Sequence, residues 1–145
     1  MNALYVLFKV AASDYAVAAA DVLQMESFSG ATAVPGTPPY VAGLVQIRGR
    51  VVPVIDMRAR FGVPAKEATL DTRVVVVQRG ERVVSLLVDS AREVLSLDPQ
   101  SFRPPPELVA EQATGFVKAV AQAGGRLIML IDCDRVINEG RANGN

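Results

Sequence analysis

The sequence predicts an all-β protein made of two small β-barrels packed against each other. Its apolar runs are short, rich in valine and isoleucine, and bounded by glycine, proline, aspartate or charged residues, which is the pattern of small β-domains. Helix signals are few and weak. A stretch near the middle of the chain also repeats near its end, which indicates two similar halves.

Each expected strand is an apolar run that ends at a turn-forming or charged residue. In chain order the strands are Leu4–Val10, Tyr15–Ala19, Val22–Phe28, Leu44–Arg48, Val51–Asp56, Arg73–Gln78, Val83–Val88, Val94–Ser96, Gly115–Ala121 and Leu127–Ile131. No basic residue precedes the first apolar run and Lys9 interrupts it, so we expect a strand there rather than a secretion signal. Short helices are expected at Met57–Phe61 and Asp132–Asn138, each directly after a strand.

The internal repeat aligns Tyr40–Phe61 with Phe116–Ile137 at a constant offset of 76 residues and without gaps. Identical residues include Gln46 with Gln122 and Asp56 with Asp132. Each copy is expected to form a strand, a tight turn with Gly-Arg, a second strand, and an aspartate that caps a short helix. A chance similarity between two valine-rich hairpins is the alternative explanation, and it stays open at this point.

We expect one domain over residues 1–145, because a half of about 70 residues buries too little apolar surface to fold alone. The approximate subdomains are residues 12–67 and 68–139, with the N-terminal strand completing either barrel. The stretch Ala65–Asp71 is the expected link between them. Two barrels packed together also create a groove, and grooves of this kind are common binding sites.

Composition argues against nucleic-acid binding and against most enzyme chemistry. Fifteen Lys and Arg balance fifteen Asp and Glu, so no excess positive field attracts phosphates or anionic lipid. A barrel that binds single-stranded nucleic acid, the first rival class, needs a basic groove with exposed aromatic side chains, and tryptophan is absent. Histidine is absent too, which removes the usual general base and the commonest metal ligand. The single cysteine, Cys133, follows an apolar run, so we expect a buried, inert thiol in a reducing compartment.

Three carboxylates, Asp56, Asp89 and Asp132, each follow or end a predicted strand. A hydrolase with paired carboxylates is the enzymatic rival, and it requires two of them in one polar cleft with one raised pKa. Caps and turns are the simpler roles for these residues, since a hard cation would need several converging oxygens. We therefore expect no catalytic residue, no metal and no cofactor.

The most distinctive segment runs from Gly43 to Arg58 and includes Gly43, a pair Arg48-Gly49, and Val-Val-Pro-Val-Ile-Asp. A tight turn at Arg48-Gly49 is predicted between two apolar strands, because Gly49 permits a positive φ. Arg48 then lies at the tip of a hairpin. It either solvates the turn or offers a guanidinium for bidentate contacts with a partner's carboxylate or carbonyl groups.

This segment resembles the signature of the CheW family, in which a glycine and apolar residues precede Arg-Gly and then Val-x-Pro-Val-x-Asp-x-Arg. Further blocks follow the family's order and spacing from about Leu4 to Ile137; they are Tyr15-x-Val17, Leu87-Val88-Asp89, Glu93-Val94-Leu95, Pro104-Pro105-Pro106 and Leu127-Ile128-x-Leu130-Ile131-Asp132. The resemblance implies two five-stranded SH3-like barrels with an apolar interface, and short helices after Asp56 and at the C-terminus.

For function, the resemblance implies a non-catalytic adaptor in the cytoplasm, at the chemoreceptor arrays of bacteria. Such proteins connect the cytoplasmic tips of methyl-accepting chemoreceptors to the regulatory domain of CheA, a histidine kinase. A receptor hairpin would lie in the groove between the barrels, and the residues that would contact it are Val22, Gly43, Arg48, Gly49 and Val94. The kinase domain would pack on the barrel ends. A divergent accessory scaffold that binds only one of these partners is the alternative.

The chain departs from the family pattern at several positions. Gln24 stands where the family usually has an acidic residue, which removes the carboxylate expected beside Arg48. Gln46 replaces an asparagine, and Ser85 and Ala119 replace glycines. Each change is expected to narrow the groove or alter its charge.

Overall fold

The structure is a computed structural model that describes residues 1–106 and 115–137. Its strands, in chain order, are β1 (Ala3–Val10), β2 (Ser13–Ala18), β3 (Val22–Ser27), β4 (Val41–Ile47), β5 (Arg50–Asp56), β6 (Arg73–Arg79), β7 (Arg82–Val88), β8 (Ser90–Leu97), β9 (Val117–Ala123) and β10 (Arg126–Ile131). The helices are short: α1 (Met57–Arg60), the 3-10 turns η1 (Ala19–Asp21) and η2 (Pro99–Ser101), and one turn over 133–137. The all-β prediction is confirmed, and both predicted helices are present, although Asn138 lies outside the described residues.

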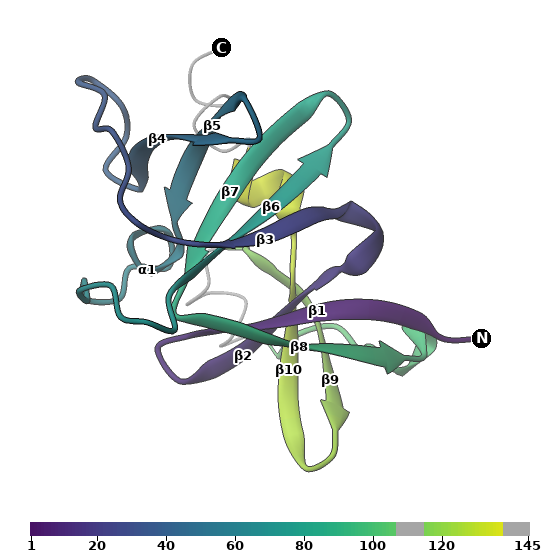
Figure 1. Cartoon of the computed structure of the whole chain (residues 1–145). Coiled ribbons are helices and arrows are strands. Elements are labelled where there is room, and N and C mark those ends of the chain that lie inside the picture. Colours follow the sequence, from purple (N-terminus) through teal and green to yellow (C-terminus); the bar gives the residue numbers. More distant parts are fainter. Residues whose placement is uncertain (107–114, 138–145) are drawn as a thin grey trace.

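The strands form two five-stranded sheets, drawn one above the other in Figure 1. The upper sheet has the order β3-β6-β7-β5-β4, and the lower has the order β8-β1-β2-β10-β9. The first barrel therefore contains β3 to β7, within residues 22–88, and the second combines the N-terminal hairpin of β1 and β2 with β8, β9 and β10. Within the described residues, no helix combines the length and hydropathy needed to cross a membrane.

This division of the chain differs from the expected subdomains 12–67 and 68–139. β6 and β7 follow the stretch Ala65–Asp71 but pair with β3 and β5, so this stretch is a loop inside the first barrel. The chain passes between barrels at η1 and at Asp89 instead. The reason is that β2 pairs in parallel with β10, more than a hundred residues away, and a contiguous division of the sequence cannot represent that pairing.

The predicted internal repeat is confirmed by equivalent hydrogen bonds in the two barrels. The N–H of Asp56 donates to the carbonyl of Tyr40 at 2.8 Å, and that of Asp132 donates to the carbonyl of Phe116 at 2.7 Å. Each aspartate also caps the helix that follows it. β5 pairs in parallel with β7 just as β10 does with β2, so the two sheets have matching strand orders.

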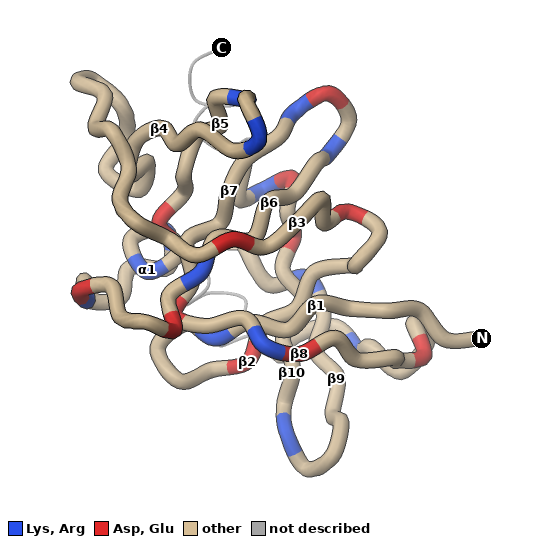
Figure 2. Tube along the Cα trace, viewed as in Figure 1, with Lys and Arg blue, Asp and Glu red and all other residues tan. Residues whose placement is uncertain are grey.

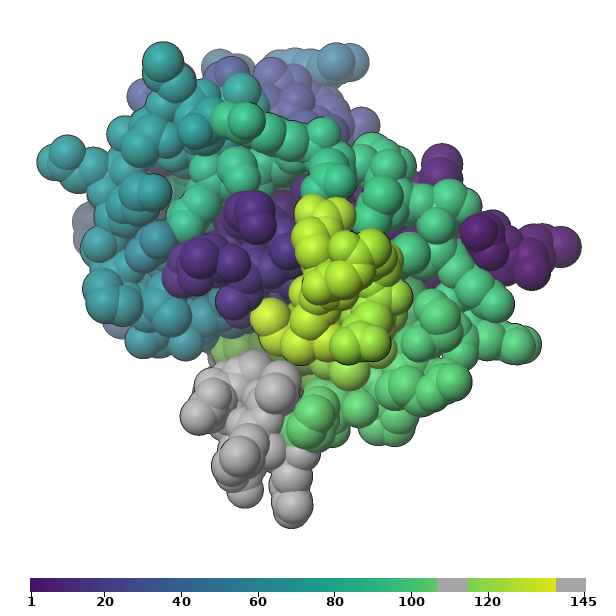
Figure 3. Space-filling view, turned by 90° about the horizontal axis from the view of Figure 1, so that it is seen from below, coloured from purple at the N-terminus to yellow at the C-terminus, as the bar shows by residue number. Residues whose placement is uncertain are grey.

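The main core lies between the two sheets and takes side chains from both. Successive side chains of β1 point to opposite faces of the sheet, and both faces are buried. Val6, Phe8 and Val10 face the core shared by the barrels, whereas Tyr5 and Leu7 belong to a smaller cluster inside the second barrel. In the view from below, the purple N-terminal segment lies between the teal segment of the first barrel and the yellow C-terminal segment (Figure 3).

Cys133 is part of the shared core and is 8% exposed, as its apolar surroundings in the sequence predict. Burial raises the pKa of the thiol to about 12. The thiol is therefore protonated near neutral pH, and we expect it to be unreactive.

Candidate protein-binding site

Arg48 lies at the tip of the β4–β5 hairpin, as predicted. Ile47 pairs with Arg50, so Arg48 and Gly49 form a two-residue turn in which both have positive φ, +52° and +78°. These angles are those of a type I′ turn, whose twist matches that of the flanking strands. The Arg48 side chain is exposed, and no carboxylate of the described residues forms an ion pair with it. The turn thus places the Arg48 side chain at the outer end of the hairpin.

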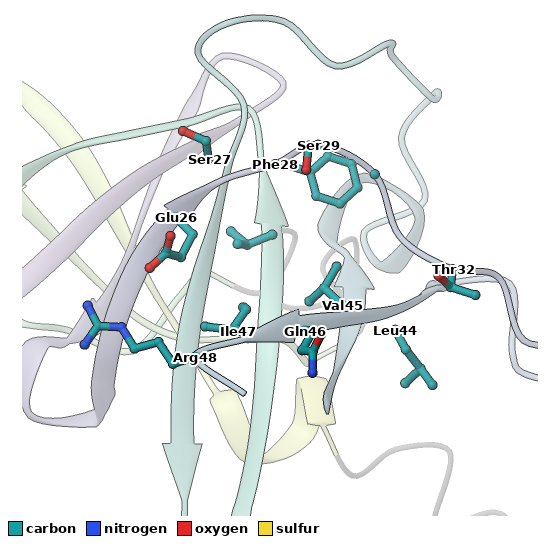
Figure 4. A pocket seen from close by; sticks show the side chains of 12 residues that line it. Glu26, Ser27, Phe28, Ser29, Thr32, Leu44, Val45, Gln46, Ile47 and Arg48 are labelled. Atoms are coloured by element: carbon teal, nitrogen blue, oxygen red, sulfur yellow. The ribbon is translucent and has the colours of Figure 1, made fainter. Parts of the chain in front are cut away.

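Beside Arg48 a cavity of about 410 Å³ opens between β3, with the segment that follows it, and β4 (Figure 4). β3 and β4 are the two edge strands of their sheet and do not pair with each other. A single antiparallel bridge, Thr32 with Leu44, connects the segment after β3 to β4. The cavity is therefore the part of the barrel wall that strand pairing leaves open.

Glu26 supplies a carboxylate at the same end of this cavity as Arg48 (Figure 4). Its Oε2 accepts a hydrogen bond from Nε2 of Gln24, the residue that replaces the expected acid. The negative charge is thus found two residues farther along β3 than the family pattern places it. Sequence analysis missed Glu26, although the alternation of Gln24 and Glu26 along one strand was a usable signal.

Gly43 is buried, and its environment shows why a glycine is required there. Its φ is +142°, and a Cβ on it would lie 2.2 Å from the carbonyl oxygen of Thr32. The residue lets the backbone at Thr32 approach β4, so in this structure Gly43 contacts the protein's own chain.

Val22 and Val94 lie on the edge strands of different sheets, β3 and β8, away from the cavity beside Arg48. Val22 pairs with Val77 and Val94 pairs with Val6, and both partners belong to the shared core. Because residues directly opposite in a sheet project from the same face, Val22 and Val94 point toward the side where the sheets meet.

Met25 lies on the same face of β3 as Val22. Met25 pairs with Val75 of the shared core and is 40% exposed, and Val94 is 51% exposed. We call Val22, Met25 and Val94 the apolar edge. The predicted contact residues thus occupy two places: Arg48 and Gly49 at the hairpin tip, with Gly43 buried in the strand behind them, and Val22 and Val94 on the apolar edge.

Comparison with known proteins decides the family. The model of the CheW-like domain matches residues 4–141. The chain belongs to the CheW-like family. The chemotaxis protein CheW of Rhizobium meliloti (strain 1021) is 32% identical over 131 residues, which cover 90% of this chain and 84% of that protein. CheW of Bacillus subtilis (strain 168) is 30% identical over 134 residues, 92% of this chain and 86% of that one.

A solved structure gives the same result for the fold. The scaffolding protein TtCheW from Thermoanaerobacter tengcongensis superposes with a TM-score of 0.84 at 29% sequence identity, covering 94% of this chain and 88% of that one. The two five-stranded sheets therefore form the two-subdomain CheW fold. Like its CheW relatives, the chain is a non-catalytic protein of chemotaxis signalling.

The carboxylates considered for an enzyme have other roles in this CheW-like domain. Asp56 and Asp132 cap helices. Asp89 forms an ion pair with Arg58 at 2.9 Å, and the hydrogen bonds from that guanidinium lower the pKa of Asp89. Asp56 and Asp89 line one small cavity of about 70 Å³, but the lowered pKa is the opposite of what a general acid requires.

The remaining departures from the family pattern are accommodated inside the barrels or at an edge. Ser85 is fully buried on β7, and its hydroxyl has no hydrogen-bond partner among the described residues. Ala119 occupies the position in the second barrel that Gly43 occupies in the first. Gln46 is exposed on β4 and lines the cavity beside Arg48.

Proposed function

We propose that this CheW-like protein is a cytoplasmic adaptor that couples the cytoplasmic tip of a chemoreceptor, a methyl-accepting protein, to the regulatory domain of a CheA-type histidine kinase at receptor arrays. The observation that supports this proposal best is the exposed guanidinium of Arg48 on a two-residue turn, where it forms no ion pair with any described residue. A cation held in this way can set the orientation of a partner through one directed polar contact.

The apolar edge supports the same proposal from the other side of β3. A helical receptor tip presents an apolar face, and exposed apolar side chains beside polar ones are typical of a surface that receives such a helix. Val22 and Met25 on β3 and Val94 on β8 pair with residues of the shared core, so they face the side where the two sheets meet. We propose that Val22, Val94, Arg48 and Gly49 contact the receptor, and that Gly43 acts indirectly by holding β4 close to Thr32.

The proposal is tested by the binding of purified receptor tip and kinase regulatory domain to the wild type and to Arg48→Asp. Aspartate tolerates the left-handed conformation at this position, so the variant is expected to fold normally. We expect receptor binding to weaken by about 2 kcal/mol, as for an interface hot spot, with no change in melting temperature. Arg50→Asp is the matched control, because Arg50 is also exposed on this hairpin but lies in the strand after the turn.

The outcomes separate the alternatives. Binding of both partners by the wild type, with receptor binding reduced only in Arg48→Asp, supports the adaptor. Binding of one partner alone would identify an accessory scaffold instead. A loss of thermal stability as large as the loss of binding would show that Arg48 is a structural residue.

A further inference from the structure

The outer edge of β4 carries backbone groups whose direction is fixed by the register. In an antiparallel pair, the N–H and C=O of successive residues point alternately toward the partner strand and away from it. Leu44 points away from β5, because its N–H donates to Thr32 O and its C=O accepts from Thr32 N–H, both at 2.8 Å. The register with β5 is unbroken from Leu44 to Ile47. Gln46, two residues after Leu44, therefore directs its N–H and C=O to the same outer side.

These groups of Gln46 have no backbone partner in the described part of the chain. Continuing the bridge between Thr32 and Leu44 would place Gly30 opposite Gln46, but the chain turns away there, with a φ of +112° at Gly30. Both residues instead line the cavity of about 410 Å³ between β3 and β4 (Figure 4). The cavity thus begins next to the bridge between Thr32 and Leu44, where backbone pairing with β4 ends.

The charged residues near the β4 edge indicate the charge of a segment that could bind there. Arg48 and Arg50 place two cations at the adjacent hairpin tip, shown in blue in Figure 2, and neither forms an ion pair with a described residue. Glu26, the acid in the cavity wall, accepts a hydrogen bond from the neutral amide of Gln24 and keeps its negative charge, so the two arginines outnumber it by one. A bound segment with a carboxylate beside Arg48 would therefore meet a cation that no described carboxylate pairs with.

We propose that the β4 edge at Gln46 binds an extended, acidic segment of a partner protein. The segment adds as a strand in the gap between β3 and β4, exchanges backbone hydrogen bonds with Gln46, and places a carboxylate against Arg48. Binding by strand addition obtains affinity from the main chain and specificity from side chains on either side. A receptor helix cannot make this contact, since its backbone groups are bonded within the helix. The site shares Arg48 with the proposed receptor contact, and the backbone groups of Gln46 are what distinguish it.

The second barrel contains an equivalent gap with a different arrangement of charge: Arg103 lines it, with its guanidinium donating to the carbonyl groups of Gln100 and Phe102, and the hairpin tip differs. There Arg103 bridges Val120, and Gln122 occupies the place of Gln46 beside a cavity of about 420 Å³. Gly124 replaces Arg48 at the turn, and Arg126 is held by Glu93 at 2.7 Å. The second gap therefore provides a matched control within the same molecule.

The test removes one backbone N–H with Gln46→Pro. Proline is tolerated on an edge strand where the N–H faces outward, so the variant is expected to fold. The probe is a fluorescein-labelled peptide of about ten residues in which glutamate and valine alternate, and its binding is followed by fluorescence anisotropy. We expect Gln46→Pro to weaken binding by about tenfold or more, and Gln122→Pro to leave it unchanged. Arg48→Glu should abolish the preference for this peptide over one with lysine in place of glutamate.

A second measurement avoids any effect of proline on folding. The same acidic peptide with every backbone nitrogen methylated should not bind the wild type, because it has no N–H group to donate to the carbonyl of Gln46. Binding of the methylated peptide, equal effects of the two proline variants, or no binding of the acidic peptide would each overturn the proposal. A dimer in sedimentation velocity that disappears in Gln46→Pro would also overturn it, since the occupant would then be a second copy of the chain. Receptor binding that persists in Gln46→Pro keeps this test independent of the adaptor function.

Discussion

At the scale of single residues, Gly43 has the strictest requirement in the candidate site. A Cβ there would lie 2.2 Å from the oxygen and 2.6 Å from the carbonyl carbon of Thr32. These are backbone atoms held by two hydrogen bonds to Leu44, so they cannot move without breaking the only described bridge across the gap. We expect Gly43→Ala to lower the free energy of unfolding by about 2 to 4 kcal/mol, measured by urea denaturation.

Gly49→Ala is the control for this prediction. Gly49 also has a positive φ, +78°, but no heavy atom lies within 4 Å of the position of its Cβ. Only the backbone conformation is strained in that variant, at a cost of about 1 kcal/mol. Equal losses in the two variants would mean that the approach of Thr32 to β4 contributes nothing to the requirement for glycine.

At the scale of secondary-structure elements, Arg58 and Asp89 connect parts of both barrels. Asp89 lies where the chain passes from β7 to β8, and it accepts hydrogen bonds from two nitrogens of Arg58 and from the N–H of Ala11, all at 2.9 Å. Arg58, on α1, also donates to the carbonyl of Pro64 at 2.7 Å. The pair therefore fixes α1 against the crossing point between the barrels.

The pKa of Asp89 is lowered, chiefly by the hydrogen bonds from Arg58 and against the effect of burial. A carboxyl whose pKa is lower in the folded state stabilises the fold above its unfolded pKa of about 4, and this stabilisation is lost as pH falls through the folded pKa. We expect Arg58→Ala to cost about 2 to 3 kcal/mol at neutral pH. The difference from the wild type, measured by urea denaturation, should shrink as the pH falls below about 4.

The pair Arg92 and Asp71 serves as the control for this pH dependence. Both side chains are more than half exposed, at 68% and 54%, so Arg92→Ala should cost less than about 1 kcal/mol at any pH. A wild-type advantage over Arg58→Ala that stayed constant from pH 7 to below about 3 would show that packing of Arg58, and not the ionised Asp89, provides the stability.

The secondary-structure elements and the repeat were predictable because their sequence patterns lie within short stretches of the chain. Strand periodicity, the Arg48-Gly49 turn and the offset of 76 residues are all visible within short stretches of the sequence, and each is present in the structure. The assignment of strands to barrels was not predictable in this way. It depends on the parallel pairing of β10 with β2, and no local pattern specifies which distant strand becomes a neighbour.

The residues of the candidate site also fall into those that local sequence predicts and those that depend on distant strands. Arg48 was found from the sequence because a two-residue hairpin turn exposes its own residues. Glu26 and the open backbone of Gln46 were not found, because both depend on the gap that β3 and β4 leave between them. The gap exists because β3 and β4 are the two edges of one sheet, and neither strand specifies it alone.

At the scale of the whole molecule, the shared core predicts that the two barrels fold as one unit. Its buried members come from both sheets and from the C-terminal turn; Phe8 of β1, Leu86 of β7, Met57 of α1 and Val136 are examples. The cluster inside the second barrel is much smaller, with Tyr5, Leu7, Ala16 and Ile128 as its buried members. Most of the large buried side chains belong to the shared core, so unfolding of either barrel would expose them, and we expect one cooperative unfolding transition. Calorimetry should give a calorimetric enthalpy equal to the van't Hoff enthalpy.

Phe8→Ala tests this cooperativity directly. Phe8 is 2% exposed in the shared core, and its removal should cost about 3 to 5 kcal/mol. Because Phe8 belongs to the second barrel but faces the first, amide exchange should accelerate equally in the slowest-exchanging residues of β6 and of β10. Phe102→Ala, which removes a ring that packs on Tyr5 at 5.2 Å at the margin of the smaller cluster, should cost less. Faster exchange confined to β10 in Phe8→Ala, or a second calorimetric transition, would mean that the barrels unfold separately and that the core between them is an interface rather than a common interior.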